Sequence, residues 1–136
     1  MRCWRPDGAG MPGPCGGYLL YGITGNSLYA INTSTGAATL VGRLGHGIWT
    51  ANALVFSSSG TLYAADSWTL YTVNTGSGLA TEVGPMGFGS GGDLAFAGGT
   101  LYLATFWGQL AMVNPSTGSG TLVGQLGASN SMGWQA

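Results

Sequence analysis

The sequence repeats itself about every 40 residues. One recurring segment reads x-Leu-x-x-(Ile/Val)-Asn, and its copies span 27–32, 69–74 and 109–114. Each copy is followed by a turn rich in Gly, Ser and Thr, and then by a short segment that ends in a Val-Gly pair, with the glycines at Gly42, Gly84 and Gly124. A period of this length predicts one supersecondary unit per repeat and a stack of such units.

Each repeat reads as a set of short strands. Runs of β-branched and aromatic residues alternate with Gly, Ser and Asn turns, and no segment has the 3.6-residue apolar period of a helix. Four short antiparallel strands in about 40 residues are typical of one blade of a β-propeller, so we expect an all-β fold. The expected strands span 18–24, 27–32 and 38–44, then 51–56, 61–65, 69–74 and 79–84, and finally 92–97, 100–105, 109–114 and 120–124. The expected core residues are Leu54, Phe56, Leu62, Leu70, Val73, Leu94, Phe96, Leu101, Leu110 and Val113.

The repeats define the domain organisation. Residues 1–17 match no repeat and are expected to be a leader, whereas 18–136 holds about three blades in a partial propeller or open arc. The blades span 18–44, 51–84 and 92–124, and 129–134 starts a further first strand. The first blade lacks its own first strand, so 131–134 is expected to pair beside 18–24 or to lie on an exposed edge. A fragment of a longer array is favoured over copies that complete a ring, and open blade edges predict self-association.

Composition excludes several classes of partner. Charged residues make up 5% of the chain, against about 25% in ordinary domains. The cations are Arg2, Arg5 and Arg43, too few to neutralise a run of phosphates, so no nucleic-acid partner is expected. No apolar run approaches the roughly 20 residues that cross a membrane, and no targeting signal is visible in 1–17.

The repeat pattern resembles that of a known group of proteins. Leu-Tyr-x-(Ile/Val)-Asn-x-x-Thr-Gly followed by Thr-x-Val-Gly is similar to the repeats of secreted bacterial β-propeller proteins and, more loosely, to quinoprotein-type propeller repeats. The resemblance runs from Tyr18 to Trp134 and implies an extracellular or cell-surface protein. Quinoprotein repeats typically carry a Trp after the Thr-Gly turn, where this chain has Val41, Val83 and Val123. No cofactor is therefore expected.

The inventory of reactive side chains is short. The acids are Asp7, Asp66, Glu82 and Asp93, and His46 is the only imidazole. No two of them have a spacing that implies a catalytic site, and Ca²⁺ prefers six to eight oxygen ligands, so neither catalysis nor a metal site is expected. Cys3 and Cys15 are too few to hold a metal; whether they form a disulfide stays open.

Large aromatic residues are the main functional signal. In such blades, the turns between second and third strands and the loops between blades emerge on one face, which gathers His46, Trp49, Trp68, Phe88 and Trp107. These rings either seal the gaps between blades or form an aromatic face that binds a carbohydrate, peptide or protein by stacking. We therefore expect a non-catalytic binding module. The alternatives are an architectural spacer of a cell-surface protein and a fragment of a quinoprotein-like propeller enzyme. Exposure of the tryptophans discriminates between binding and architecture.

Overall fold

The computed structural model describes residues 19–127, which form eleven β-strands and no helix. The first sheet contains β1 (Leu19–Thr24), β2 (Ser27–Asn32) and β3 (Ala38–Arg43). The second contains β4 (Ala53–Phe56), β5 (Leu62–Ala65), β6 (Thr69–Val73) and β7 (Ala80–Pro85). The third contains β8 (Ser90–Ala97), β9 (Thr100–Thr105), β10 (Gln109–Val113) and β11 (Gly120–Gln125). The expected leader and the expected strand at 129–134 lie outside the described residues.

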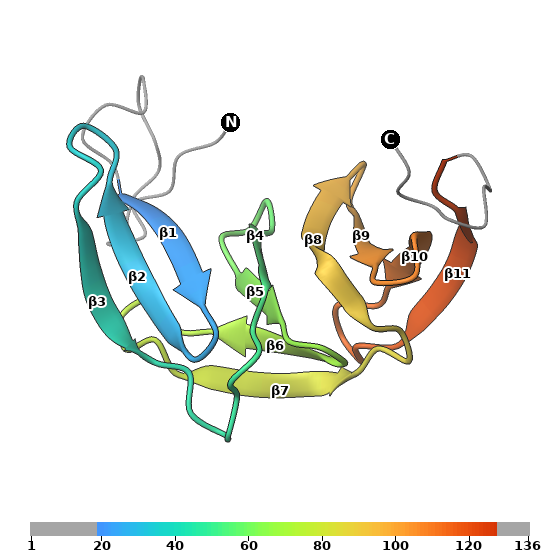
Figure 1. Ribbon diagram of the computed structural model, residues 1–136, viewed down its shortest axis with the longest axis horizontal. Coiled ribbons are helices and arrows are strands. Elements are labelled where there is room, and N and C mark those ends of the chain that lie inside the picture. Colours follow the sequence, from blue (N-terminus) through green and yellow to red (C-terminus); the bar gives the residue numbers. More distant parts are fainter. Residues whose placement is uncertain (1–18, 128–136) are drawn as a thin grey trace.

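Each sheet is an antiparallel meander in which sequential strands are neighbours. The three sheets follow one another along a U-shaped arc (Figure 1). Strands β1, β4 and β8 lie on the inner side of the arc, and β3, β7 and β11 lie on its outer side (Figure 1). The chain therefore starts each complete sheet on the inner side and leaves it on the outer side.

The expected all-β fold is confirmed, and so are the eleven strands that fall within the described residues. The strand expected at 51–56 begins only at Ala53, because Ala51 forms an isolated bridge with Gly25. The strand expected at 92–97 begins earlier, at Ser90, because Ser90 pairs with Thr105 across a bulge. The first difference arises from pairing with another sheet, and the second from an irregularity within the β8–β9 hairpin.

The repeated asparagines open the turns that lead to β3, β7 and β11. The Oδ1 atom of Asn74 accepts hydrogen bonds from the backbone N–H groups of Gly76 and Ser77, at 2.8 and 3.0 Å. Asn32 and Asn114 form the same kind of bond two residues along the chain, each at 2.8 Å. Each turn closes on a glycine with a positive φ, which a residue with a Cβ rarely adopts; these are Gly36, Gly78 and Gly118.

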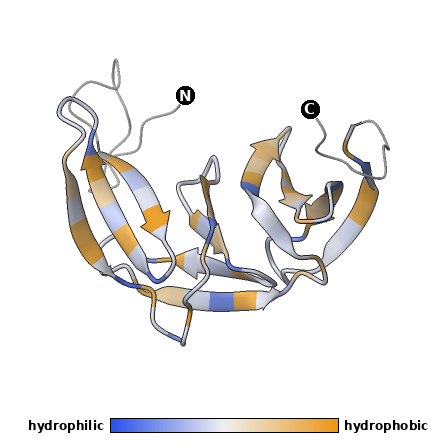
Figure 2. Cartoon of the chain, in the orientation of Figure 1, coloured by the Kyte–Doolittle hydropathy of each residue, from blue (hydrophilic) through white to orange (hydrophobic). Residues whose placement is uncertain are grey.

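The core lies between the sheets, in two clusters. Leu28, Leu62 and Val73 belong to the cluster between the first and second sheets, and Leu70 and Leu101 belong to the cluster between the second and third. Hydrophobic residues recur along the strands of all three sheets (Figure 2), and β4 and β5 of the second sheet are apolar or aromatic at every position, so both faces of this sheet can pack against a neighbour. The ten residues expected in the core are buried, except for four that are half-buried: Leu54, Phe56, Phe96 and Leu110.

Adjacent sheets also touch through backbone. A Cβ on Gly42 of β3 would collide with the carbonyl oxygen of Ser77, and Gly78 packs on the backbone of Gly42. Beside this contact, the N–H of Ala80 donates to the carbonyl of Leu44 at 2.9 Å. The first and second sheets are therefore joined by a contact that leaves no room for a side chain.

The second and third sheets repeat this contact. A Cβ on Gly84 of β7 would collide with the carbonyl oxygen of Thr117, and Gly118 packs on Gly84. The N–H of Gly120 donates to the carbonyl of Met86 at 2.9 Å. We call these two sites the glycine contacts.

Replacing a glycine in one of these contacts should destabilise the protein. Gly42→Ala places a methyl group against the carbonyl of Ser77, and overpacking of this kind costs about 1–3 kcal/mol. Chemical denaturation should show a lower midpoint with an unchanged slope. Gly76→Ala is the control, because its Cβ would meet only Asn74 Oδ1, at 3.3 Å. Equal midpoints for the two variants would contradict the role of the contact.

Candidate functional site

Hairpin turns and inter-sheet loops meet along one edge of the arc. The N–H of Ser90, at the start of the third sheet, donates to the carbonyl of Ser67 in the β5–β6 turn at 2.8 Å. The N–H of Phe106, in the β9–β10 turn, donates to the carbonyl of Gly89 in the preceding loop at 2.8 Å. At the first sheet, the β1–β2 turn meets the β3–β4 loop through the bridge between Gly25 and Ala51. These bonds place the aromatic loops along a common edge.

Four large aromatic side chains are exposed on that edge. The exposed fractions are 68% for Trp49, 56% for Trp68, 67% for Phe106 and 70% for Trp107. We call these four residues the aromatic edge. Rings that sealed the gaps between sheets would be buried, so the exposure favours the binding interpretation over the sealing one.

Three of these four residues lie in a row, in which Trp68 and Phe106 meet at Gly89 and Phe106 packs on Trp107. The Trp68 ring lies 3.5 Å from the Cβ position of Gly89, and the Cβ atom of Phe106 lies 3.7 Å from the same position. Phe106 and Trp107 pack edge to face, with 5.2 Å between their ring centroids. The row therefore crosses from the β5–β6 turn of the second sheet to the β9–β10 turn of the third.

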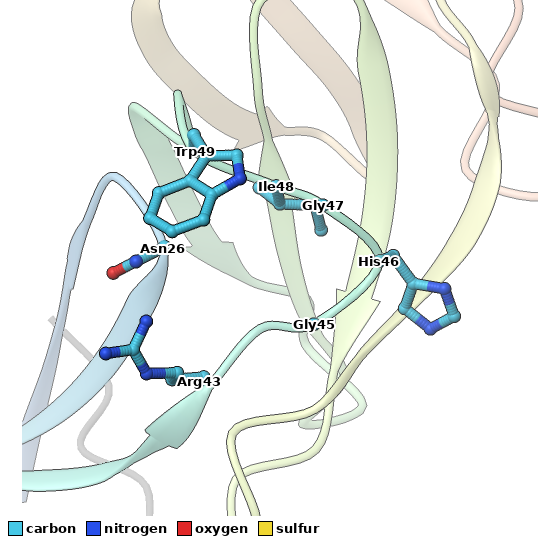
Figure 3. Close-up of a pocket in the computed structure, with 7 residues that line it drawn as sticks. All are labelled: Asn26, Arg43, Gly45, His46, Gly47, Ile48 and Trp49. Carbon is cyan, nitrogen blue, oxygen red and sulfur yellow. The ribbon is translucent and has the colours of Figure 1, made fainter.

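Trp49 stands beside a small hollow. This hollow has a volume of about 120 Å³ and is lined by the β1–β2 turn, the end of β3 and the loop after it. Trp49, Asn26 and Arg43 gather at one side of it (Figure 3). Enclosed ligand sites usually measure about 300–1,000 Å³, so this hollow is too small to enclose a ligand. A ligand bound beside Trp49 would therefore rest on the surface. Next to Trp49, the Thr50 hydroxyl accepts a hydrogen bond from Ser67, at 3.2 Å, which links this end to the row.

Two of the sequence-predicted residues lie apart from the tryptophans. His46 is exposed on the β3–β4 loop with a φ of 54°, and its ring points away from Trp49 and Arg43 (Figure 3). Phe88 is half-buried and packs against the core between the second and third sheets. The Phe88 ring reaches the Cβ position of Gly120, so it contributes to packing between sheets. Phe106, by contrast, belongs to the exposed row.

Asp66 shapes the turn that carries Trp68. Its Oδ1 atom accepts the backbone N–H groups of Trp68 and Thr69 at 3.0 and 2.9 Å, and its Oδ2 atom accepts the Tyr71 hydroxyl at 3.1 Å. These bonds engage both oxygens of the carboxylate in the turn. Asp66 therefore positions Trp68.

Burial raises the pKa of the Tyr71 hydroxyl above its usual value of 10.0, and the negative charge of Asp66 adds to the rise. Burial also raises the pKa of Tyr21, against a smaller opposing effect of a hydrogen bond to Thr75. Both phenols therefore favour the neutral form in the folded protein more than in the unfolded chain.

Within residues 19–127, no three His, Cys, Asp or Glu side chains come close enough together to hold a metal ion. The same residues contain no helix that is long and apolar enough to cross a membrane. Cys3 and Cys15 lie outside the described residues.

No protein-family model and no curated protein matches this sequence. Among solved structures, the chain is similar to the computationally designed Ika8 protein, with a TM-score of 0.51 and 14% identity. The alignment covers 81% of this chain and 35% of the designed chain. At this identity, the likeness concerns the fold alone.

Alkaline pH should destabilise the fold through Tyr21 and Tyr71. Each tyrosine stabilises the folded state fully below the unfolded pKa of about 10, and this contribution is lost as the pH rises through the higher folded pKa. The free energy of unfolding should therefore fall from about pH 10 upward. Replacing both residues by Phe should flatten this decline, measured by urea titrations between pH 8 and 12. Parallel curves for the double variant and the wild type would contradict the assignment.

Removing the Asp66 carboxylate should loosen the turn under Trp68. Asp66→Ala removes three hydrogen bonds and should destabilise the protein by about 0.5–2 kcal/mol, as for other side chains that cap backbone N–H groups. Asp66→Asn keeps an oxygen acceptor at the turn and should therefore lose less stability than Asp66→Ala. Thermal unfolding measures the difference, and equal losses would argue against the role of the backbone bonds.

Proposed function

We propose that the three sheets are blades of a β-propeller and that the aromatic edge binds a carbohydrate. The exposed row of Trp68, Phe106 and Trp107 carries this proposal. The propeller assignment is supported by the repeated four-stranded meander, by the inner position of each first strand in Figure 1 and by the repetition of the glycine contacts.

Exposed aromatic rings offer flat apolar surfaces to a ligand. Soluble proteins rarely expose several large aromatic side chains side by side unless the patch binds something. The apolar C–H face of a sugar ring can stack on such a surface, in the same way that other flat ligands stack on aromatic side chains. The row spans two sheets, which suits a chain of several sugar units better than a single one.

The chemistry around the rings suits a neutral, hydroxyl-rich ligand. Ser67 and Thr50 present hydroxyl groups between Trp49 and Trp68, and the amide of Asn26 lies beside Trp49. The nearby carboxylate of Asp66 is engaged in the turn. Binding would therefore depend on stacking and on uncharged hydrogen bonds, rather than on ion pairs.

Truncating a ring of the row should weaken binding while the protein stays folded. We expect Trp68→Ala and Trp107→Ala each to lower the affinity by about 1–3 kcal/mol, or roughly 5- to 150-fold. The affinity is measured by the quenching of tryptophan fluorescence on titration with cellohexaose, chitohexaose and xylohexaose. Because few charges take part, the affinity should change little between 50 and 500 mM NaCl.

Leu40→Ala is the matched control. Leu40 is an exposed apolar residue in the middle of β3, with 54% of its surface accessible, and it does not belong to the aromatic edge. The Leu40→Ala variant should bind the oligosaccharides with the same affinity as the wild type. Failure of the wild type to bind any of them, or equal effects of the three variants, would overturn the carbohydrate proposal. Binding of a peptide library in place of the sugars would move the assignment to a peptide partner.

A further inference from the structure

The first and third sheets each have one face that points away from the second sheet, and we call these two faces the outward faces of the arc. Together they resemble the two halves of an internal interface between sheets. Leu62 of β5 and Leu101 of β9 occupy the same place in the second and third sheets, and they are 2% and 0% exposed. Each is covered by the preceding sheet. The equivalent residue of the first sheet is Leu20 in β1, which is 50% exposed. At Leu20, the first sheet thus exposes a position that the other two sheets bury.

The third sheet presents the complementary face. Leu44 follows β3 and Met86 follows β7, and each is 1% exposed because the next sheet covers it. Leu126 follows β11 at the equivalent position and is 41% exposed. Val123 of β11 and Met112 of β10 are also exposed, at 51% and 39%. An apolar surface therefore continues across this sheet.

The glycine contacts occur at two of the three equivalent positions. Gly42 and Gly84 each receive a turn from the next sheet, whereas no other described atom lies within 4 Å of the Cβ position of Gly124. Conversely, Gly78 and Gly118 each pack on a preceding sheet, whereas the Cβ position of Gly36 has no described neighbour within 4 Å. Among the described residues, Gly124 thus receives no turn from a following sheet, and Gly36 packs on no preceding sheet.

We propose that the outward face of the first sheet of one copy docks on the outward face of the third sheet of a second copy. The Gly36 turn would then pack on Gly124, and the N–H of Ala38 would donate to the carbonyl of Leu126. These contacts reproduce those of Gly78 with Gly42 and of Ala80 with Leu44. The proposal is independent of the carbohydrate site.

The docking faces carry little charge. No Asp, Glu, Lys or Arg occurs in β1, β2, β9, β10 or β11, whereas β3 carries Arg43 and β8 carries Asp93. Association would therefore bury mainly apolar surface, and Asp93, which takes in β8 the position of the buried Ala53 in β4, must keep contact with water or gain a polar partner at the inner side of the interface. Leu20 of one copy would enter the environment that Leu62 and Leu101 already occupy.

The interface is head to tail, because two different faces meet. Head-to-tail contacts form a closed ring when their rotation closes and an open filament when it does not. The three sheets follow a U-shaped arc (Figure 1), so a second copy can close the ring with six sheets. The proposed species is therefore a dimer with two identical interfaces.

Sedimentation of the full chain over a range of concentrations tests the proposal, and the wild type should form a dimer. Gly124→Val fills the site that would receive the Gly36 turn and should weaken association by about 5- to 150-fold per interface, since overpacking costs about 1–3 kcal/mol. Thr121→Val is the control, because the equivalent Thr39 and Thr81 remain exposed beside the internal interfaces. Circular dichroism checks that each variant is folded.

A mixing experiment tests the head-to-tail geometry. Leu20→Asp damages only the first-sheet face and Gly124→Val damages only the third-sheet face, so each variant alone should be a monomer at concentrations at which the wild type is a dimer. Mixed together, they should form a heterodimer through the one interface that remains intact. A wild type that stays monomeric at millimolar concentration, a Gly124→Val variant that dimerises as tightly as the wild type, or a mixture without heterodimer would overturn the proposal. Open polymers of the wild type would overturn closure by two copies.

Discussion

The fold depends on two places where backbone meets backbone between sheets. At Gly42 and Gly84, the outer strand of one sheet lies against the turn that enters the outer strand of the next, with no space for a side chain. The hydrogen bonds from Ala80 and Gly120 lie beside these contacts, so spacing and register are fixed together. The apolar clusters fill the volume that this spacing leaves between the sheets. Side-chain packing alone tolerates some sliding, whereas a directional bond beside a close contact does not.

The aromatic edge depends on that spacing. Trp68 belongs to the second sheet and Phe106 to the third, and they approach each other across Gly89 only because the two sheets lie in a fixed register. Asp66 sets the local turn, and the Asn52 and Ser90 side chains, joined at 2.8 Å, link the start of β4 to the start of β8 near the same edge. Local turns thus orient each ring, while the contacts between sheets determine the distance between rings.

Much of this architecture could be predicted from the sequence, because the signals are local. Strand alternation, the asparagines that open turns and the glycines that close them act within a few residues, so the strand bounds differ from expectation by one or two positions at most sites. The late start of β4 depends on a bridge to the first sheet, and the bulge in β8 depends on an irregular pairing with β9, so neither was predictable in this way. The same holds for the aromatic residues. Phe88 lies in the β7–β8 loop and Phe106 in the β9–β10 turn, yet Phe88 packs against Gly120 of the third sheet, whereas Phe106 stays exposed. The period revealed Gly42 and Gly84 as landmarks but not as contact points, since the turn that meets each one lies more than 30 residues away.

The second sheet differs from its neighbours in one respect that bears on dynamics. It supplies residues to both core clusters, whereas the first and third sheets supply residues to one each. A linear stack of this kind behaves as a chain of units coupled to their nearest neighbours, and terminal units open more readily than a unit held from both sides. Amide hydrogens of β5 and β6 would then exchange with solvent mainly through global unfolding, and those of β2 and β10 through local opening of a terminal sheet. The turn that presents Trp68 therefore belongs to the most protected part of the molecule, which gives a binding surface at its centre a rigid base.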